Sequence, residues 1–143
     1  MTLRQATPFA AVLLLAACAQ QQVATAPAGP DYNLGIAAVC KPSEPKLVPG
    51  ATAQAEMQMG NDGGWCAVRV SDAGKAFASG TLPGRPAHGR VLVRRAGSQT
   101  FLDYLPAPGY SGPDSFTAKL IPNERTEAES TVHVTVQVAP KGA

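Results

Sequence analysis

The strongest constraint on the fold is a strict alternation of apolar and polar residues near the C-terminal end of the chain. Between residues 131 and 139, valines occupy every second position (Val132, Val134, Val136 and Val138), and His133, Thr135 and Gln137 lie between them. A period of two places the two sets of side chains on opposite faces of a β-strand. We therefore predict a half-buried strand whose valine face closes one sheet over the core.

Other segments carry weaker forms of this pattern, namely residues 51–59, 65–71, 90–95, 99–105 and 115–121. Residues 51–59 contain good helix formers, but their alternation favours a strand. Turn residues separate the segments, as in Asn61-Asp62-Gly63-Gly64, and residues 80–89 are expected to form a Gly- and Pro-rich connection. This spacing of short strands and turns predicts an all-β fold, an antiparallel immunoglobulin-like β-sandwich that forms a single domain over residues 34–143.

Composition excludes some classes of partner. The 143 residues suit about one domain, and the net charge is only +2 without a long run of either sign. Proteins that bind nucleic acid usually carry a clustered basic face and a pI above about 9. We therefore expect no nucleic-acid partner.

The N-terminal segment predicts secretion. Arg4 supplies a positive charge, and residues 9–17 form an apolar stretch that is too short to span a bilayer, which takes about 20 residues. The stretch ends in Leu15-Ala16-Ala17-Cys18, which resembles the lipobox of bacterial lipoproteins. The resemblance implies that residues 1–17 are a cleaved signal peptide. An ordinary signal peptide with a chance cysteine is the alternative.

In that family the cysteine thiol receives a diacylglycerol and the new N-terminus receives a further fatty acid such as palmitate, so Cys18 is the expected lipidation site. Ala19 follows it instead of the Asp that retains such proteins in the inner membrane, which favours the outer membrane. Whether the domain faces the periplasm or the cell exterior stays open. Residues 18–33 are rich in small residues, Gln and Pro, and are expected to be the lipidated cysteine and a flexible tether.

The remaining cysteines form an even pair. With Cys18 assigned to lipid, Cys40 and Cys66 are left in an oxidising compartment, where a disulfide is expected. Two buried free thiols are the alternative. Neither the spacing of these cysteines nor the positions of His88 and His133 match a zinc site, so we expect no metal and no cofactor beyond the lipid.

A second resemblance covers residues 83–138. The segments Pro86-Ala87-His88-Gly89-Arg90-Val91 and residues 104–116 (YLPAPGYSGPDSF) are similar to the cadherin-like, immunoglobulin-like repeats of bacterial surface proteins. The resemblance gives a structural role to a corner formed by Tyr104, Gly109, Gly112, Asp114 and Phe116. The Tyr104 hydroxyl is expected to bond nearby loop backbone, and Asp114 is expected to cap loop N–H groups. Calcium-binding linker motifs are absent from the sequence.

No catalytic constellation emerges from the sequence, and we expect a protein that is not an enzyme. A candidate interaction surface comprises Trp65, Arg69, Arg90 and Arg94, with Arg85 and Arg95 nearby. Trp65 would serve as an anchor or a sugar-stacking platform, and the arginines would meet anionic envelope glycans or an acidic protein. The plainer interpretation is a solvated face whose charges protect a sheet edge.

Two functional hypotheses follow. The first is a lipid-anchored envelope protein with a non-enzymatic interaction or structural module, as an accessory subunit of an outer-membrane or surface complex. The second is a small periplasmic inhibitor or a glycan- or ligand-binding lipoprotein.

Overall fold

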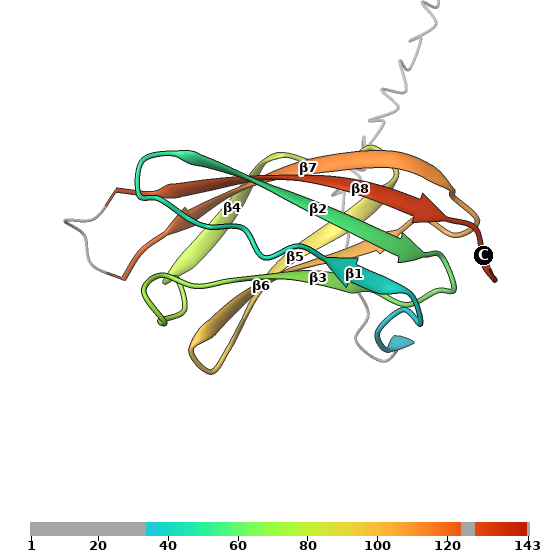
Figure 1. The fold of residues 1–143 in the computed structure, drawn as a ribbon, viewed down its shortest axis with the longest axis horizontal. Coiled ribbons are helices and arrows are strands. Elements are labelled where there is room, and N and C mark those ends of the chain that lie inside the picture. Colours follow the sequence, from blue (N-terminus) through green and yellow to red (C-terminus); the bar gives the residue numbers. More distant parts are fainter. Residues whose placement is uncertain (1–33, 124–127, 143) are drawn as a thin grey trace, which may run out of the picture.

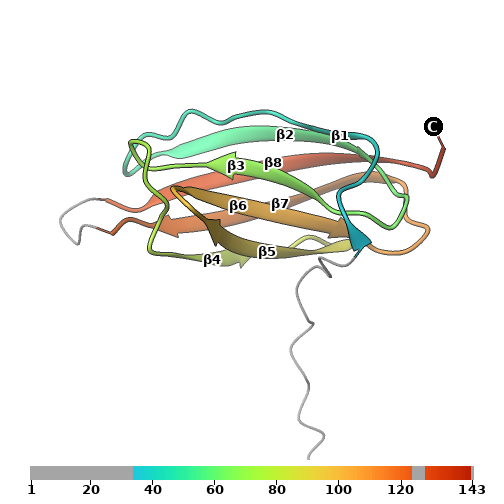
Figure 2. The same ribbon diagram turned by 90° about the horizontal axis from the view of Figure 1, so that it is seen from below.

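A computed structural model describes residues 34–123 and 128–142 of the chain. The described part is a β-sandwich of two packed sheets, seen from two directions in Figures 1 and 2. The prediction of an all-β sandwich is confirmed. The strands are β1 (Cys40–Pro42), β2 (Thr52–Gly60), β3 (Cys66–Val70), β4 (Ser79–Gly84), β5 (Gly89–Ala96), β6 (Gln99–Pro106), β7 (Gly112–Ile121) and β8 (Ser130–Ala139).

The larger sheet has the order β1-β2-β8-β7-β4. Its inner face carries the predicted valines of β8, all four of them buried, together with apolar side chains of its neighbours, Met57, Met59, Phe116, Ala118 and Leu120. One detail corrects the prediction of an antiparallel sandwich, because β2 and β8 pair in parallel, with Ala53 opposite Val132 and Met59 opposite Val138. Alternation along a strand sets the buried face but carries no information on the direction of its neighbour.

The smaller sheet has the order β3-β6-β5. Its inner face places Val68, Leu102 and Tyr104 in the core with no exposed surface. Antiparallel pairing sets Tyr104 opposite both Cys66 of β3 and Val91 of β5. Strand β6 is therefore bonded on both sides, to β3 and to β5.

Two strands, β1 and β4, were missing from the sequence-based expectation. Residues 79–84 form β4, which pairs with β7 through a register shift between Thr81 and Gly84, so the prediction of an unstructured connection over 80–89 was wrong for its first half. Strand β7 begins at Gly112 and not at Ser115. Close packing explains why residue 80 of β4 is a glycine, because a Cβ there would lie 2.9 Å from Cγ1 of Val93 in the opposite sheet.

The disulfide between Cys40 and Cys66 is confirmed, with a Cα–Cα distance of 5.4 Å. Cys40 belongs to β1 of the five-stranded sheet and Cys66 to β3 of the three-stranded sheet. The bond therefore joins the two layers at one edge of the sandwich, where Cys66 is completely buried.

One end of the sandwich gathers several turns, and we call it the groove end. It comprises the β2–β3 turn (61–65), the β4–β5 turn (85–88), the β6–β7 turn (107–111) and the C-terminal residues 140–142, on the side of Figure 1 where the C-terminus is marked. Leu34, the first described residue, lines a hollow at this end. The predicted signal peptide, the Cys18 lipidation site and the tether over residues 18–33 lie outside the described residues.

Candidate functional site

The corner residues meet at the carboxylate of Asp114. Its Oδ2 accepts a hydrogen bond from the Tyr104 hydroxyl at 2.8 Å and another from the His88 N–H at 2.9 Å. Its Oδ1 accepts from the N–H groups of Ala87 and Ser115, at 3.0 and 2.9 Å. One side chain of β7 thus ties the buried end of β6 to the β4–β5 turn, and the Tyr104 hydroxyl bonds a carboxylate where loop backbone was expected.

These hydrogen bonds change the acid–base behaviour of both side chains. Burial alone would raise the pKa of Asp114, but the Tyr104 hydroxyl and the N–H groups of Ser115, His88 and Ala87 stabilise the charged form and bring the pKa below its ordinary value. The pKa of Tyr104 is strongly raised, first by burial and then by its hydrogen bond to the Asp114 carboxylate. The pair therefore consists of a carboxylate and a neutral phenol at all ordinary pH values.

Aromatic contacts extend this corner. The ring of Tyr110 stacks on the imidazole of His88 at 4.1 Å between centroids, and its hydroxyl donates to the carbonyl oxygen of Pro113 at 2.5 Å. The ring of Phe116, buried in the core, lies parallel to Tyr104 at 6.0 Å. Gly109 and Gly112 have positive φ angles of 75° and 132°, which side-chain-bearing residues rarely adopt.

Sequence reasoning missed one member of this end of the molecule. The buried Asn61 donates two hydrogen bonds across the sandwich, to the carbonyl oxygens of Ala107 at 2.7 Å and Tyr110 at 2.9 Å. The sequence marked Asn61 only as the first residue of a turn. Nothing in its local pattern distinguishes a turn-forming Asn from one that holds a distant loop.

The outer face of the three-stranded sheet carries a charged pair among aromatic rings. Nε of Arg94 donates to Oδ2 of Asp103 at 2.7 Å, and Asp103 has no exposed surface. The Arg94 guanidinium also lies 4.5 Å from the centroid of Phe101 and 5.5 Å from that of Trp65. Arg94 and Trp65 therefore belong to a packed cluster, and Trp65 is half-buried where the sequence suggested an exposed ring.

The four residues of the predicted interaction surface do not form one basic patch. Arg69 forms an ion pair with Glu44 at the opposite end of β3 from Trp65. Arg94 is engaged by Asp103, and Arg90 lines the hollow at the groove end. The structure thus brings Trp65 and Arg94 together but leaves Arg69 and Arg90 in separate surroundings.

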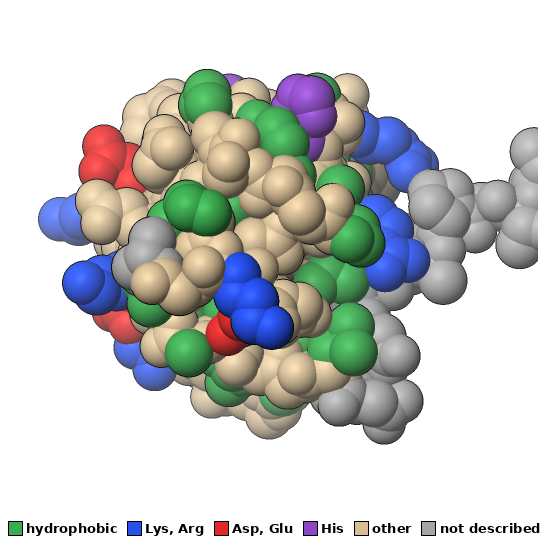
Figure 3. All heavy atoms as spheres, turned by 90° about the vertical axis from the view of Figure 1, so that its right-hand side faces the viewer, with side chains coloured by type: hydrophobic (Ala, Val, Ile, Leu, Met, Phe, Trp, Pro, Cys, Tyr) green, Lys and Arg blue, Asp and Glu red, His purple; other side chains and the backbone are tan. Residues whose placement is uncertain are grey.

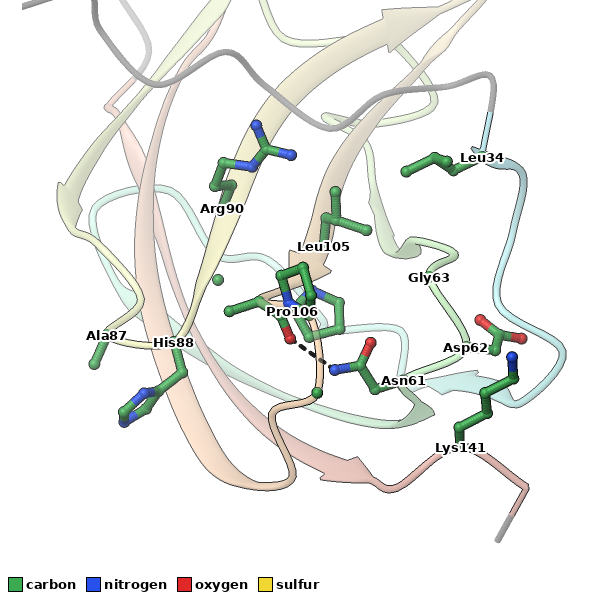
Figure 4. Close-up of a pocket in the computed structure, with 14 residues that line it drawn as sticks. Leu34, Asn61, Asp62, Gly63, Ala87, His88, Arg90, Leu105, Pro106 and Lys141 are labelled. Atoms are coloured by element: carbon green, nitrogen blue, oxygen red, sulfur yellow. Dashed lines mark hydrogen bonds between the residues drawn. The ribbon is translucent and has the colours of Figure 1, made fainter.

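The hollow at the groove end is an open groove of about 630 Å³. Its wall is mainly apolar, with Leu34 from the start of the described chain and Leu105, Pro106 and Pro108 from the end of β6 and the β6–β7 turn. Figure 4 shows Arg90 and His88 on one side of it and Lys141 beside Asp62 on the other. An apolar wall with basic groups at its rim suits a ligand or surface that is both apolar and anionic.

The acidic groups at this end are occupied. Asp62 accepts hydrogen bonds from the N–H groups of Ala38 at 2.8 Å and Gly64 at 2.9 Å. These bonds, with that to Ala38 as the largest effect, keep its pKa below the ordinary value. Asp114 holds four donors, as described above. Both carboxylates therefore stay charged, and Asp62 lies beside Lys141, so the excess of positive charge at the groove end comes from Arg85 and Arg90.

Two further findings concern only residues 34–123 and 128–142. Within them, no three His, Cys, Asp or Glu side chains are grouped so that they could hold a metal ion. In the same part of the chain, no helix has the length and apolar character needed to cross a bilayer.

Comparison with known proteins gives no match: no family model, no curated protein and no solved structure is significantly similar to this chain.

Proposed function

We propose that this protein is a lipid-anchored cell-envelope protein whose β-sandwich is a non-enzymatic interaction or structural module. The observation that carries the proposal is the motif Leu15-Ala16-Ala17-Cys18 at the end of a nine-residue apolar stretch, residues 9–17. A lipid on Cys18 and a second acyl chain on the new N-terminus would give stable anchoring, since one chain alone holds a protein only marginally. The absence of Asp at position 19 favours the outer membrane.

The disulfide supports this compartment. Disulfides form and persist in oxidising environments such as the bacterial periplasm, and are rare in the cytosol. The Cys40–Cys66 bond uses both cysteines that lipidation would leave, and it joins the two sheets. A secreted, lipidated chain accounts for all three cysteines at once.

The cadherin-like resemblance supports the role of the domain. The residues that carry it, Tyr104, Asp114 and the glycines of the β6–β7 turn, hold the turns of the groove end in fixed positions by hydrogen bonds and stacking. Such a frame fixes the shape of the domain without chemistry of its own. We infer an accessory subunit of an envelope complex, with a protein as the expected partner.

The alternative, a periplasmic inhibitor or glycan-binding lipoprotein, relied on Trp65 with Arg69, Arg90 and Arg94 as one basic surface. Arg69 and Arg94 are each engaged by a carboxylate, and Trp65 packs under Arg94. These contacts reduce the charge available to an anionic glycan, so we place this function second.

Affinity purification from detergent-solubilised envelopes tests the proposal. The lipidated protein should co-purify with a defined protein partner in fixed proportion, whereas a Cys18→Ser variant, expressed at the same level, should recover less of it. Purification of the protein alone, with Trp65 fluorescence that responds to peptidoglycan or lipopolysaccharide fragments, would favour the alternative.

A further inference from the structure

We infer that the groove end of the sandwich rests directly on an anionic lipid surface, so that the anchored domain has a fixed orientation on the membrane. This inference rests on the proposed lipid anchor at Cys18. It adds a contact surface of the folded domain that the anchor itself does not require.

The described domain begins at the groove end, on the side of the proposed anchor in the sequence. Leu34 lines the groove, and only fifteen residues, 19–33, separate it from Cys18. A flexible chain of that length has a root-mean-square reach of roughly 20 Å. Since the described domain begins at Leu34, the groove end is the part of the domain that the fewest residues separate from the anchor.

Exposed apolar side chains gather at the same end. Leu34 and Ile36 are 54% and 64% exposed, and they are two of the three large hydrophobic residues that are exposed in the described part of the chain. Ile36 forms an isolated bridge with Trp65 and lies beside the β2–β3 turn, where the backbone of residues 36 and 37 approaches Gly64. Clustered apolar side chains on a surface mark a contact with a partner or a membrane.

Basic groups surround these residues. Arg90 and Lys141 line the groove and Arg85 belongs to the β4–β5 turn, so three cations face the two carboxylates of this end, Asp62 and Asp114. Figure 3 shows this end of the molecule, with green hydrophobic side chains next to blue Lys and Arg side chains. Basic groups beside apolar ones suit the boundary between anionic headgroups and acyl chains.

Trp65 provides a built-in reporter. It is the single tryptophan of the chain, it is half-buried, and it is the last residue of the β2–β3 turn, bridged to Ile36. The full-length lipidated protein would be reconstituted into vesicles of phosphatidylcholine and phosphatidylglycerol that contain spin-labelled phosphatidylcholine as a quencher. We expect the quencher to lower Trp65 fluorescence about twofold, and less in vesicles without phosphatidylglycerol.

Matched variants identify the surface. Leu34→Ser with Ile36→Ser, and separately Lys141→Glu, should restore most of the fluorescence. Val48→Ser is the control for the apolar pair, because Val48 is 54% exposed but precedes β2 at the opposite end of the sandwich. Lys75→Glu, in the β3–β4 connection at that opposite end, is the control for the charge. Circular dichroism checks that each variant is folded.

The failure of this inference differs from the failure of the proposed function. The intact mass of the reconstituted protein reports the lipid on Cys18, and its absence would refute the anchor. Lipidated protein without quenching, or with equal losses in the Val48 and Leu34/Ile36 variants, would leave the anchor in place and overturn the oriented contact.

Discussion

The Tyr104 hydroxyl donates a 2.8 Å hydrogen bond to the Asp114 carboxylate from the core side of the sandwich, while the N–H groups of Ala87 and His88 in the β4–β5 turn, and of Ser115 in β7, donate to the same carboxylate. Tyr104 has no exposed surface, and Asp114 is partly exposed on β7. The pair therefore couples core packing to the geometry of the groove end.

Tyr104→Phe isolates the hydroxyl from the ring. The ring would keep its packing, but Asp114 would lose one of its four donors, and a hydrogen bond to a charged group contributes about 1.5–3 kcal/mol. Urea unfolding of the soluble Cys18→Ser protein should show a loss in this range. Tyr104→Ala, which also empties core volume, should cost about 3 kcal/mol or more. A negligible loss in both variants would contradict the proposed corner.

Asp114 should make stability depend on pH. Its pKa is lower in the folded protein than in the unfolded chain, so its contribution is present above about pH 4 and disappears as the pH falls through the folded-state pKa. Asp114→Asn should therefore destabilise the protein by about 1–3 kcal/mol at pH 7, and by progressively less as the pH falls below about 4.

Asp62→Asn is the comparison for this titration. Asp62 is exposed, and water screens its interactions, so its replacement should have the smaller effect on stability at pH 7. Urea denaturation at several pH values measures both variants. If the Asp114 variant kept a constant difference from the parent between pH 7 and pH 3, the role of the carboxylate would be refuted.

Gly89 should not tolerate a side chain. A Cβ there would lie 2.6 Å from Cε2 of Tyr104 and 2.8 Å from the carbonyl oxygen of Leu105. Gly89→Ala should cost about 1–3 kcal/mol through displacement of the Tyr104 ring. Gly60→Ala is the control, because its Cβ would lie 3.6 Å from that of Val39, an ordinary contact. Equal thermal stability of the two variants would contradict the close packing around Tyr104.

The two arginine pairs should differ in strength. Arg94→Ala would remove a guanidinium from the fully buried Asp103 carboxylate and should cost about 3 kcal/mol. Arg69→Ala breaks an exposed pair with Glu44 and should cost at most about 1 kcal/mol. Urea unfolding compares the variants directly, and a larger loss for Arg69 would show that the Arg94 cluster is not a stabilising element.

Sequence alone predicted the parts of this fold that depend on local alternation. The valines of β8 and the inward residues of β3 and β6 were assigned to the core correctly, because one buried face imposes a period of two. Strand β4 escaped prediction because SGTLPG has few strand-forming residues, and its pairing with β7 holds it in place. Phe77 lies in the core from a connection, where no periodic pattern marks it.

The candidate site was predictable only in pieces. The cysteine count led to the correct prediction of the Cys40–Cys66 disulfide. This bond links the two sheets of a sandwich that contains few large apolar residues. Asp103 could not be predicted in this way. An acidic residue on the outward face of a strand is expected to be exposed to water, but Asp103 is fully buried beside Arg94. The groove likewise forms from Leu34, Leu105 and Lys141, which only the folded chain brings together.

The central claim, lipid anchoring through Cys18, is tested most directly by membrane fractionation in a Gram-negative host with the intact mass of the product. The parent protein should lose residues 1–17, gain the mass of a diacylglycerol and an acyl chain, and sediment with the outer membrane after a salt wash. Cys18→Ser should be recovered as soluble, unlipidated protein. Firm membrane attachment of the Cys18→Ser protein, or a parent protein without lipid, would contradict the account.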